Sequence, residues 1–439
     1  MGLRGPFRAS PFVFSEELSS GGSPLIGPCA LNLRKIRLNL PKDHIVDPFS
    51  ATLEALDCSG LPVRRGASIC IAVGSRGIHA IDEITKAVAG YVKSRGGCPF
   101  IIPAMGSHGG ATPQGQIGIL AEYGITEQSM GVPIAGDMDV VELPLEKSPF
   151  RLFMSRSAFN ADGIILVNRI KPHTDFHGKY ESGLVKMSVI GLGKHAQALE
   201  MHSFGVYGLR ELVPEAARHI LDTGKIVAGV AVVENSLEKP MLIEAMRGDA
   251  IMEREPALLE ISRGSMAHLP VEKLDLLVVD YIGKDFSGTG LDTNVIGRMR
   301  IRGEREPVSP SIKMIVVGDV SERSHGNALG IGLADVITER LYKRIDFGAM
   351  YENALTSTFV ERVKVPVIAG TDTLAIEYAL RCLGRIKPDD VRVARIRSTL
   401  HLGELYVSEN IFGELLEKGE VESSEEPRPL CAGDEFSLF

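Results

Sequence analysis

Several features are absent from the sequence, and each absence excludes a class of protein. No run of about 18 apolar residues occurs, so no membrane-spanning helix is expected. The start, MGLRGPFRASPFVF, lacks the apolar region of a secretory signal, and Pro6 breaks the myristoylation pattern. The net charge is -8 and no basic stripe occurs, which gives no reason to expect nucleic acid. We therefore expect a cytoplasmic protein with neither a membrane nor a nucleic-acid partner.

Cysteine is scarce, and its spacing is informative. The chain has 6 cysteines in 439 residues, and none lies within four residues of another. This spacing excludes the common zinc-finger and iron–sulfur patterns. Scattered cysteines in a long chain indicate reduced thiols in a reducing compartment.

What the chain does have is the composition of a globular protein, with 44% hydrophobic and 24% charged residues. Its length suggests two or three domains. Short apolar runs predict strands at 69–74, 100–104, 163–168, 226–233, 274–280, 314–319, 365–370 and 391–396. Amphipathic stretches between them predict helices at 80–94, 114–123, 208–222, 251–263, 332–344 and 372–384. Fully apolar strands that alternate with helices predict an α/β fold of two domains, with mainly parallel sheets flanked by helices and an interdomain active site.

Composition also suggests where the domains begin and end. Residues 1–34 are expected to form a flexible extension, because the first 30 are rich in Gly, Pro and Ser. A catalytic and cofactor domain is expected over 35–268, since a long helix ends near Gly264 and a new strand follows. The second α/β domain would span 269–420, and the acidic tail at 421–439 would lie outside the core.

Open parallel sheets bind ligands at the carboxyl ends of their strands, so the loops there are the places to search. After the first strand, Arg76 lies between glycines, and its guanidinium suits a carboxylate or phosphate. After the second, His108 lies in a glycine-rich loop that runs through Thr112 and Pro113 into a helix. Such a loop is a natural anion cradle, and packing gives His108 little reason to be buried.

The stretch 168–186 is an unusually long loop after a strand, and it contains His173, His177 and Lys186. Long loops in compact domains tend to be functional or disordered. Pro172 and the glycines argue against the helix that a metal-binding pair of His173 and His177 would need.

Two further loops carry chemical groups. Gly191-x-Gly193-x-x-Ala196 resembles a dinucleotide-binding fingerprint, although its acidic partner is not evident. A helix from Lys194 would place His195 and His202 on one face. In the second domain, Lys284 follows a strand and could contact substrate or phosphate across the interdomain cleft.

Taken alone, these residues indicate an enzyme that uses a metal or cofactor together with histidine acid–base chemistry. Neutral imidazoles serve as metal ligands or as acids and bases, and a lysine can hold a cofactor covalently. Alternatives remain open at this point. They are an NAD-type oxidoreductase using residues 191–196, a zinc hydrolase using His108, His173 and His202, and a non-catalytic binding protein.

The pattern resembles the nickel-pincer-nucleotide-dependent lactate racemase (LarA-like) family over residues 35–420. The resemblance rests on Gly106-Ser107-His108 after its strand and on His173 before a stretch that ends at Lys186. It also rests on His202, which follows Lys186 by sixteen residues. It implies an isomerase (racemase or epimerase) that inverts C2 of a 2-hydroxy acid by hydride transfer to and from the cofactor.

The resemblance also implies a role for each residue. Lys186 would hold the nickel-pincer nucleotide (pyridinium-3,5-bisthiocarboxylic acid mononucleotide with nickel), and His202 would bind its metal. His108 and His173 would be the acid–base pair. The other expected contacts are Ser75, Gly109 and Gly110 for the cofactor, and Arg76 and Lys284 for the substrate carboxylate. The expected partners are a 2-hydroxy acid and the enzymes that make the cofactor.

The chain also departs from the family pattern. Lactate racemases carry Asp-x-Thr-Arg-Pro where this chain has Val73-Gly74-Ser75-Arg76-Gly77, and the stretch 173–186 is longer here. We therefore expect a divergent subgroup that acts on a 2-hydroxy acid other than lactate.

Overall fold

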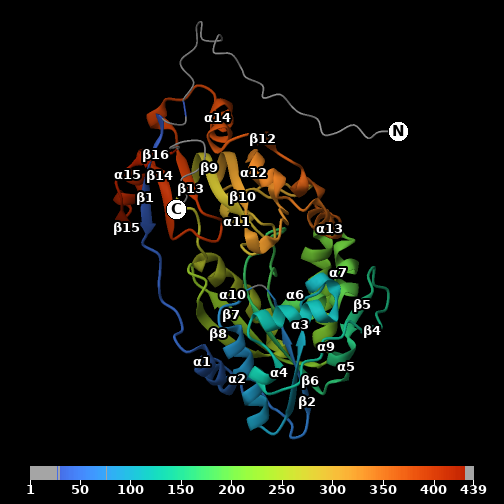
Figure 1. Ribbon diagram of the computed structural model, residues 1–439. Coiled ribbons are helices and arrows are strands. Elements are labelled where there is room, and N and C mark those ends of the chain that lie inside the picture. Colours follow the sequence, from blue (N-terminus) through green and yellow to red (C-terminus); the bar gives the residue numbers. More distant parts are fainter. Residues whose placement is uncertain (1–26, 28–29, 76, 431–439) are drawn as a thin grey trace, which may run out of the picture.

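The computed structural model describes residues 27, 30–75 and 77–430, which form two α/β domains (Figure 1). The sheet of the first domain has the strand order β3-β2-β6-β7-β8. The strands are β3 (Cys98–Pro103), β2 (Ser68–Val73), β6 (Gly163–Arg169), β7 (Ile226–Glu234) and β8 (Pro240–Arg247). All are parallel except β8, which pairs antiparallel with β7.

Helices cover both faces of this sheet, which explains why its central strands are apolar throughout. Side chains of α1 (Pro48–Cys58) and α2 (Ile81–Ser94) pack with Ile71 and Val73 of β2 on one face. On the other face, α9 (Val213–Asp222) and α10 (Ile251–Ser265) pack with Leu166 of β6. Smaller elements surround the sheet: α3 (Pro113–Glu122), α4 (Glu127–Met130), α5 (Arg156–Asn160), α8 (Gly205–Tyr207), β4 (Val140–Leu143) and β5 (Leu152–Ser155).

The second domain has a nine-stranded mixed sheet. Its parallel part runs β12 (Val367–Ala369), β11 (Val336–Thr338), β10 (Ser311–Val320), β9 (Lys273–Ile282) and β13 (Val393–Ile396). Antiparallel pairs then add β14 (Glu404–Ser408), β1 (Asn32–Leu38), β15 (Val421–Ser424) and the short β16 (Arg428–Pro429). One face packs on α14 (Asp372–Cys382), and the other on α12 (Glu339–Lys343), α13 (Phe347–Ser357) and α15 (Glu409–Glu417). The α/β class with mainly parallel sheets flanked by helices is therefore confirmed.

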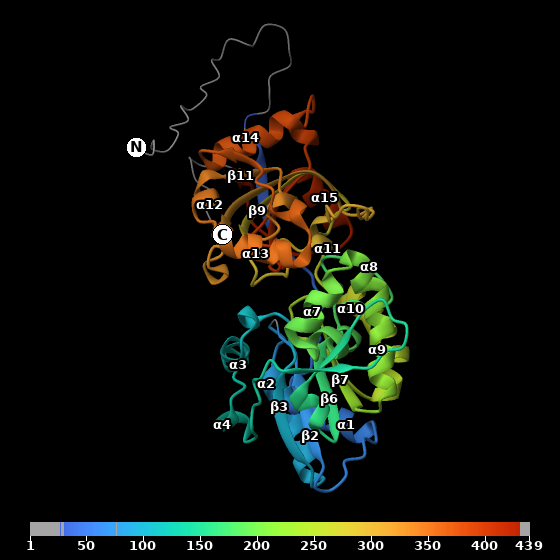
Figure 2. The same cartoon turned by 90° about the vertical axis from the view of Figure 1, so that its right-hand side faces the viewer.

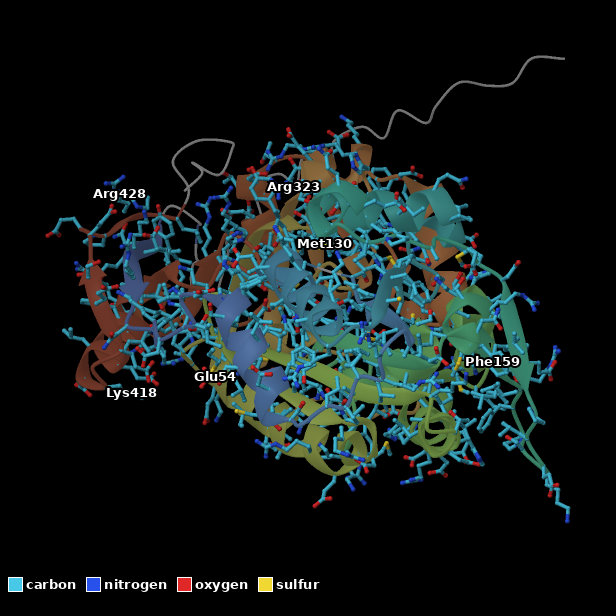
Figure 3. All side chains as sticks on the ribbon, turned by 90° about the horizontal axis from the view of Figure 1, so that it is seen from below. Glu54, Met130, Phe159, Arg323, Lys418 and Arg428 are labelled. Atoms are coloured by element: carbon cyan, nitrogen blue, oxygen red, sulfur yellow. The ribbon has the colours of Figure 1, made fainter. Side chains whose placement is uncertain are left out.

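The two ends of the described chain meet in this second sheet. β1 lies between β14 and β15, so residues 35–38 and 421–429 belong to the sheet of the second domain. Figure 3 shows Lys418 and Arg428 at this edge of the molecule. The strands escape a search for apolar runs because buried Leu33 and Ile36 alternate with charged residues. The acidic tail therefore does not lie wholly outside the core.

One predicted helix is shorter than expected. The stretch 332–344 begins with a turn and the buried strand β11, and only Glu339–Lys343 forms a helix. A strand of three residues does not stand out against helical periodicity, which explains the error. The predicted helix at 208–222 is present, although its first turn, Gly208–Leu212, is π-helical.

Two expectations from composition can also be compared with the described residues. Within them, no helix is long and apolar enough to cross a membrane. Cys58, Cys70, Cys98 and Cys382 are free thiols, as the cysteine spacing predicts.

The domains contact each other through the loops that follow their parallel strands. Figure 2 shows α3 and α7 (Lys194–His202) at the end of the first domain that faces α13 and α11 (Thr293–Ile296) of the second. Thr293 Oγ1 donates to the Thr174 carbonyl across this boundary, at 2.8 Å. Arg210 and Glu304 form an ion pair of 2.8 Å between the domains.

Candidate active site

Candidate residues follow three neighbouring parallel strands of the first domain. Ser75 follows β2, His108 follows β3 and His173 follows β6. Because the carboxyl ends of parallel strands meet at one sheet edge, the three loops lie side by side. The structure brings the first two side chains together, with Ser75 Oγ 2.6 Å from His108 Nδ1.

The loop that carries His108 is held by its own glycines and by the helix that follows. Gly109 and Gly110 have φ of 65° and 63°, which favours glycine. A Cβ on Gly109 would lie 2.5 Å from the Gly115 carbonyl carbon. Thr112 caps α3 by accepting from the Gly115 N–H, as the sequence predicted. The two glycines therefore let the backbone turn from His108 into the N-terminus of α3, and they place no side chain beside that N-terminus.

Two buried side chains that sequence reasoning missed support this loop from beneath. Gln116 Nε2 donates to the carbonyls of Gly106 and His108, at 2.8 and 3.2 Å. Lys194 Nζ donates to the Pro103 carbonyl at 2.6 Å. Burial lowers the pKa of Lys194 to about 8. Lys194 thus joins the start of α7 to the end of β3.

His173 lies in the long loop after β6, and its ring is buried. Its Nε2 contacts Lys186 Nζ, and its Nδ1 accepts from the Asp175 N–H at 3.0 Å. The ring also packs against Phe176, with centroids 4.6 Å apart. Two backbone hydrogen bonds between Lys171 and Ser182 close the loop. The structure thus brings His173 and Lys186 together.

Glu181 organises the interior of this loop. Its carboxylate accepts from the N–H groups of His173 and Gly178, at 2.6 and 3.0 Å, and pairs with Arg263. Burial opposes ionisation, but hydrogen bonds from His177 and the backbone lower the pKa of Glu181 below its usual value. His177 therefore binds Glu181 at 3.3 Å instead of forming a metal-binding pair with His173.

The Asp175 carboxylate interacts electrostatically with several candidate residues of the site. Burial alone would raise its pKa, but Arg362 and then His173, Lys186 and His202 lower the pKa well below its usual range. The same carboxylate therefore feels the charges of three residues that the sequence singled out. Across the described part of the chain, no group of three or more His, Cys, Asp or Glu side chains could hold a metal ion.

Lys186 and His202 lie on two consecutive helical segments, which are separated by a turn at 192–193, after which Lys194 begins α7 with a φ of 56°. Lys186 ends the short α6 (Leu184–Lys186), a π-helical turn spans Met187–Gly191, and His202 ends α7. Glu255 of α10 fixes the beginning of the first segment by accepting from the Val185 N–H at 2.8 Å. Burial raises the pKa of Glu255 to about 7.

The dinucleotide fingerprint at 191–196 is wrong. A strand should precede its glycines, but the π-helical turn Met187–Gly191 leads into them, and Gly193 is the N-cap of α7. A Cβ on Gly191 would lie 2.7 Å from the Ala104 carbonyl oxygen, and one on Gly193 would lie 2.8 Å from the Phe153 carbonyl oxygen. These glycines let the two helical segments pack closely on β5 and on the end of β3.

Of the two residues expected to bind the substrate carboxylate, only Lys284 is among the described residues. Lys284 follows β9, where its Nζ donates to the Gly288 carbonyl at 2.8 Å and its N–H donates to Ser324 Oγ at 2.7 Å. Its place at a strand end of the second domain agrees with the sequence analysis, and its role stays a prediction. Arg76 lies outside the described residues.

No family model and no curated protein matches this sequence. Among solved structures, the chain is similar to the lactate racemase apoprotein from Thermoanaerobacterium thermosaccharolyticum. The chain has a lactate-racemase-like fold. The match covers 84% of this chain and 99% of the other, with a TM-score of 0.53 and 12% sequence identity. At this identity the likeness concerns the arrangement of the two α/β domains.

Proposed function

We propose that this protein is an isomerase (racemase or epimerase) that inverts C2 of a 2-hydroxy acid, using a nickel-pincer nucleotide tethered to Lys186. The observation that carries the proposal is the contact between Lys186 Nζ and His173 Nε2, within a cluster that also includes Asp175 and His202. The lactate-racemase-like fold supports the same class of reaction.

The residues fit a covalently held nucleotide. An amine must be neutral to form a covalent bond with a thiocarboxylate. Since the Asp175 N–H donates to His173 Nδ1, a neutral imidazole carries its proton on Nε2, which faces Lys186. An amine that accepts this proton is a neutral amine. Lys186 is therefore arranged as a nucleophile, which tethering requires.

Two other parts of the site fit the remaining groups of the cofactor. His202, eight residues after Lys194 on α7, would supply an imidazole ligand for the metal. Space around Gly110 is open, since a Cβ there would meet nothing within 4 Å, and the α3 N-terminus follows. A phosphate would be stabilised at such a position. When bound, the cofactor would accept a hydride from C2 of the substrate and return it to either face.

The two histidines would move the substrate hydroxyl proton. If His108 Nδ1–H donates to Ser75 Oγ, the lone pair of the neutral ring is on His108 Nε2, which would accept that proton from one enantiomer. Once Lys186 carries the cofactor, its nitrogen no longer accepts from His173. A shift of the His173 proton to Nδ1, which lies 3.8 Å from Asp175 Oδ2, would then let Nε2 accept the hydroxyl proton of the other enantiomer. Arg76 and Lys284 would hold the substrate carboxylate.

Intact-protein mass spectrometry with metal analysis tests this function. The protein is co-expressed with the pincer-cofactor biosynthetic enzymes in medium that contains nickel. We expect a covalent mass increment and bound nickel, both lost in Lys186→Ala. Lys179→Ala is the matched control, because Lys179 is exposed in the same loop and should keep the increment. Wild-type protein without adduct and without nickel would contradict the proposal.

A further inference from the structure

One buried arginine of the second domain reaches into the loop that carries His173. Arg362 belongs to a 3-10 turn, Val360–Val363, and is only 1% exposed. Its Nη1 pairs with Asp175 Oδ1 at 2.5 Å, and its Nη2 donates to the Thr174 carbonyl at 2.9 Å. Its Nε donates to the Met299 carbonyl at 3.0 Å. The guanidinium thus joins its own domain to the loop of the other.

The residues that Arg362 holds also define the surroundings of His173. The Asp175 N–H donates to His173 Nδ1, and Asp175 Oδ2 lies 3.8 Å from the same nitrogen. A second contact comes from the same domain, since Asn294 Nδ2 donates to the His173 carbonyl at 3.3 Å. The position of this loop therefore depends on the docked second domain.

We propose that Arg362 is a positioning residue that keeps the proton of neutral His173 on Nε2, facing Lys186, by holding Asp175 in place. This placement of the His173 proton is a property of the protein without cofactor. That it keeps the Lys186 amine neutral for covalent attachment of the cofactor rests on the proposed function.

The charges around Asp175 explain why the guanidinium is needed. A buried carboxylate close to Nδ1 favours a proton on that nitrogen, because the pair then gains a charge-assisted hydrogen bond. Arg362 takes up the carboxylate, so that Nδ1 is left to the backbone N–H of Asp175. Without Arg362, the proton of His173 would move to Nδ1 and Nε2 would offer a lone pair to Lys186. An ammonium group that donates to this lone pair cannot be acylated.

Nuclear magnetic resonance of the histidine side chains in full-length, ¹⁵N-histidine-labelled protein tests the inference. The signals of His173 are identified as those that disappear in the variant His173→Gln. In the wild type we expect Nδ1 without a proton and Nε2 with one. In Arg362→Met the proton should move, so that Nδ1 carries it and Nε2 does not. In the double variant Arg362→Met/Asp175→Asn the wild-type tautomer should return, because the amide keeps the backbone N–H and removes the carboxylate.

A matched control separates this effect from a loss of stability. Arg395 and Asp280 form another buried ion pair, at 2.8 Å, inside the second domain. Arg395→Met should lower the melting temperature and leave the His173 signals unchanged. Should Arg362→Met not fold, Arg362→Lys replaces it. A lysine keeps the charge but cannot serve Asp175 and Thr174 together, so a mixture of the two tautomers is expected.

Two results would overturn the inference. One is an unchanged His173 tautomer in the folded Arg362 variant, and the other is an equal change in Arg395→Met. Both results are measured in protein without cofactor. They therefore do not depend on whether wild-type protein forms the Lys186 adduct. A missing adduct together with a reversed tautomer would contradict the proposed function alone.

Discussion

At the scale of single residues, the candidate site depends on which nitrogen of each histidine carries a proton. A side-chain hydroxyl contacts Nδ1 of His108, whereas a backbone N–H occupies Nδ1 of His173. Each contact leaves Nε2 as the atom directed to other groups. The two histidines therefore have different partners at Nδ1, and Nε2 would accept a proton in His108 whereas it carries one in neutral His173.

Ser75→Ala tests the role of this contact at His108. Loss of one hydrogen bond is worth about 1 kcal/mol, which corresponds to roughly fivefold in rate when the bond orients a proton-transferring group. We expect kcat of the loaded enzyme to fall by about fivefold in chiral assays of 2-hydroxy acid interconversion, with little change in KM. Ser203→Ala, which removes an exposed hydroxyl next to His202, should change neither constant. Equal rates for wild type and Ser75→Ala would show that Ser75 does not orient His108.

The sequence could predict some site residues because their local context is unusual. His108 stands among glycines before a helix, and His173 and Lys186 share a long loop after a strand. Asp175 and Arg362 have no such local signal, because their role depends on a contact between positions 187 residues apart. Glu181 was overlooked for the same reason, since its partners are mainly backbone N–H groups of a folded loop.

At the scale of elements, Glu255 links a helix to the segment that carries Lys186. Its pKa of about 7 in the folded protein lies above the value of 4.5 for an unperturbed glutamate. The folded state therefore binds the proton more tightly, and this contribution to stability is complete below pH 4.5 and is lost as the pH rises through 7. The shift corresponds to about 3 kcal/mol.

Glu255→Gln should therefore be more stable than the wild type above pH 7, because it keeps an acceptor for the Val185 N–H without a charge. The difference should shrink toward pH 4.5. Urea unfolding at a series of pH values measures both curves. Glu253→Gln, an exposed position on the same helix, should follow the wild type at every pH. If Glu255→Gln also runs parallel to the wild type, the pKa of Glu255 in the folded protein is not raised above its value in the unfolded chain.

Elements differ in how well the sequence predicts them. β2, β6, β9 and β10 are central parallel strands, and their apolar runs identify them. β1, β8, β14 and β15 were not predicted, because antiparallel strands near a sheet edge alternate buried and exposed residues. Pairing partners far along the chain, and not local periodicity, decide that such segments become strands.

At the scale of the whole molecule, the chain crosses between the domains twice. β1 begins in the second domain, residues 39–47 lead to α1 in the first, and the chain returns after α10 to form β9. The first crossing is docked on the first domain, where the Ile45 N–H donates to the Pro240 carbonyl at 2.7 Å. The end of the chain then covers β1, so both ends of the described chain stabilise the domain that supplies Arg362.

Leu430→Ala tests whether the end of the chain is part of this core. Leu430 is 2% exposed, packs with Leu31, Leu33 and Leu276, and donates its N–H to the Leu31 carbonyl at 2.8 Å. Truncation of a buried leucine costs about 2–4 kcal/mol, so the unfolding transition of the second domain should move to lower temperature in calorimetry. Leu416→Ala is the control, because Leu416 is 57% exposed and its loss should cost less than about 0.5 kcal/mol. A tail outside the core would make the two substitutions equally harmless, whereas a tail that covers β1 makes only Leu430→Ala destabilising.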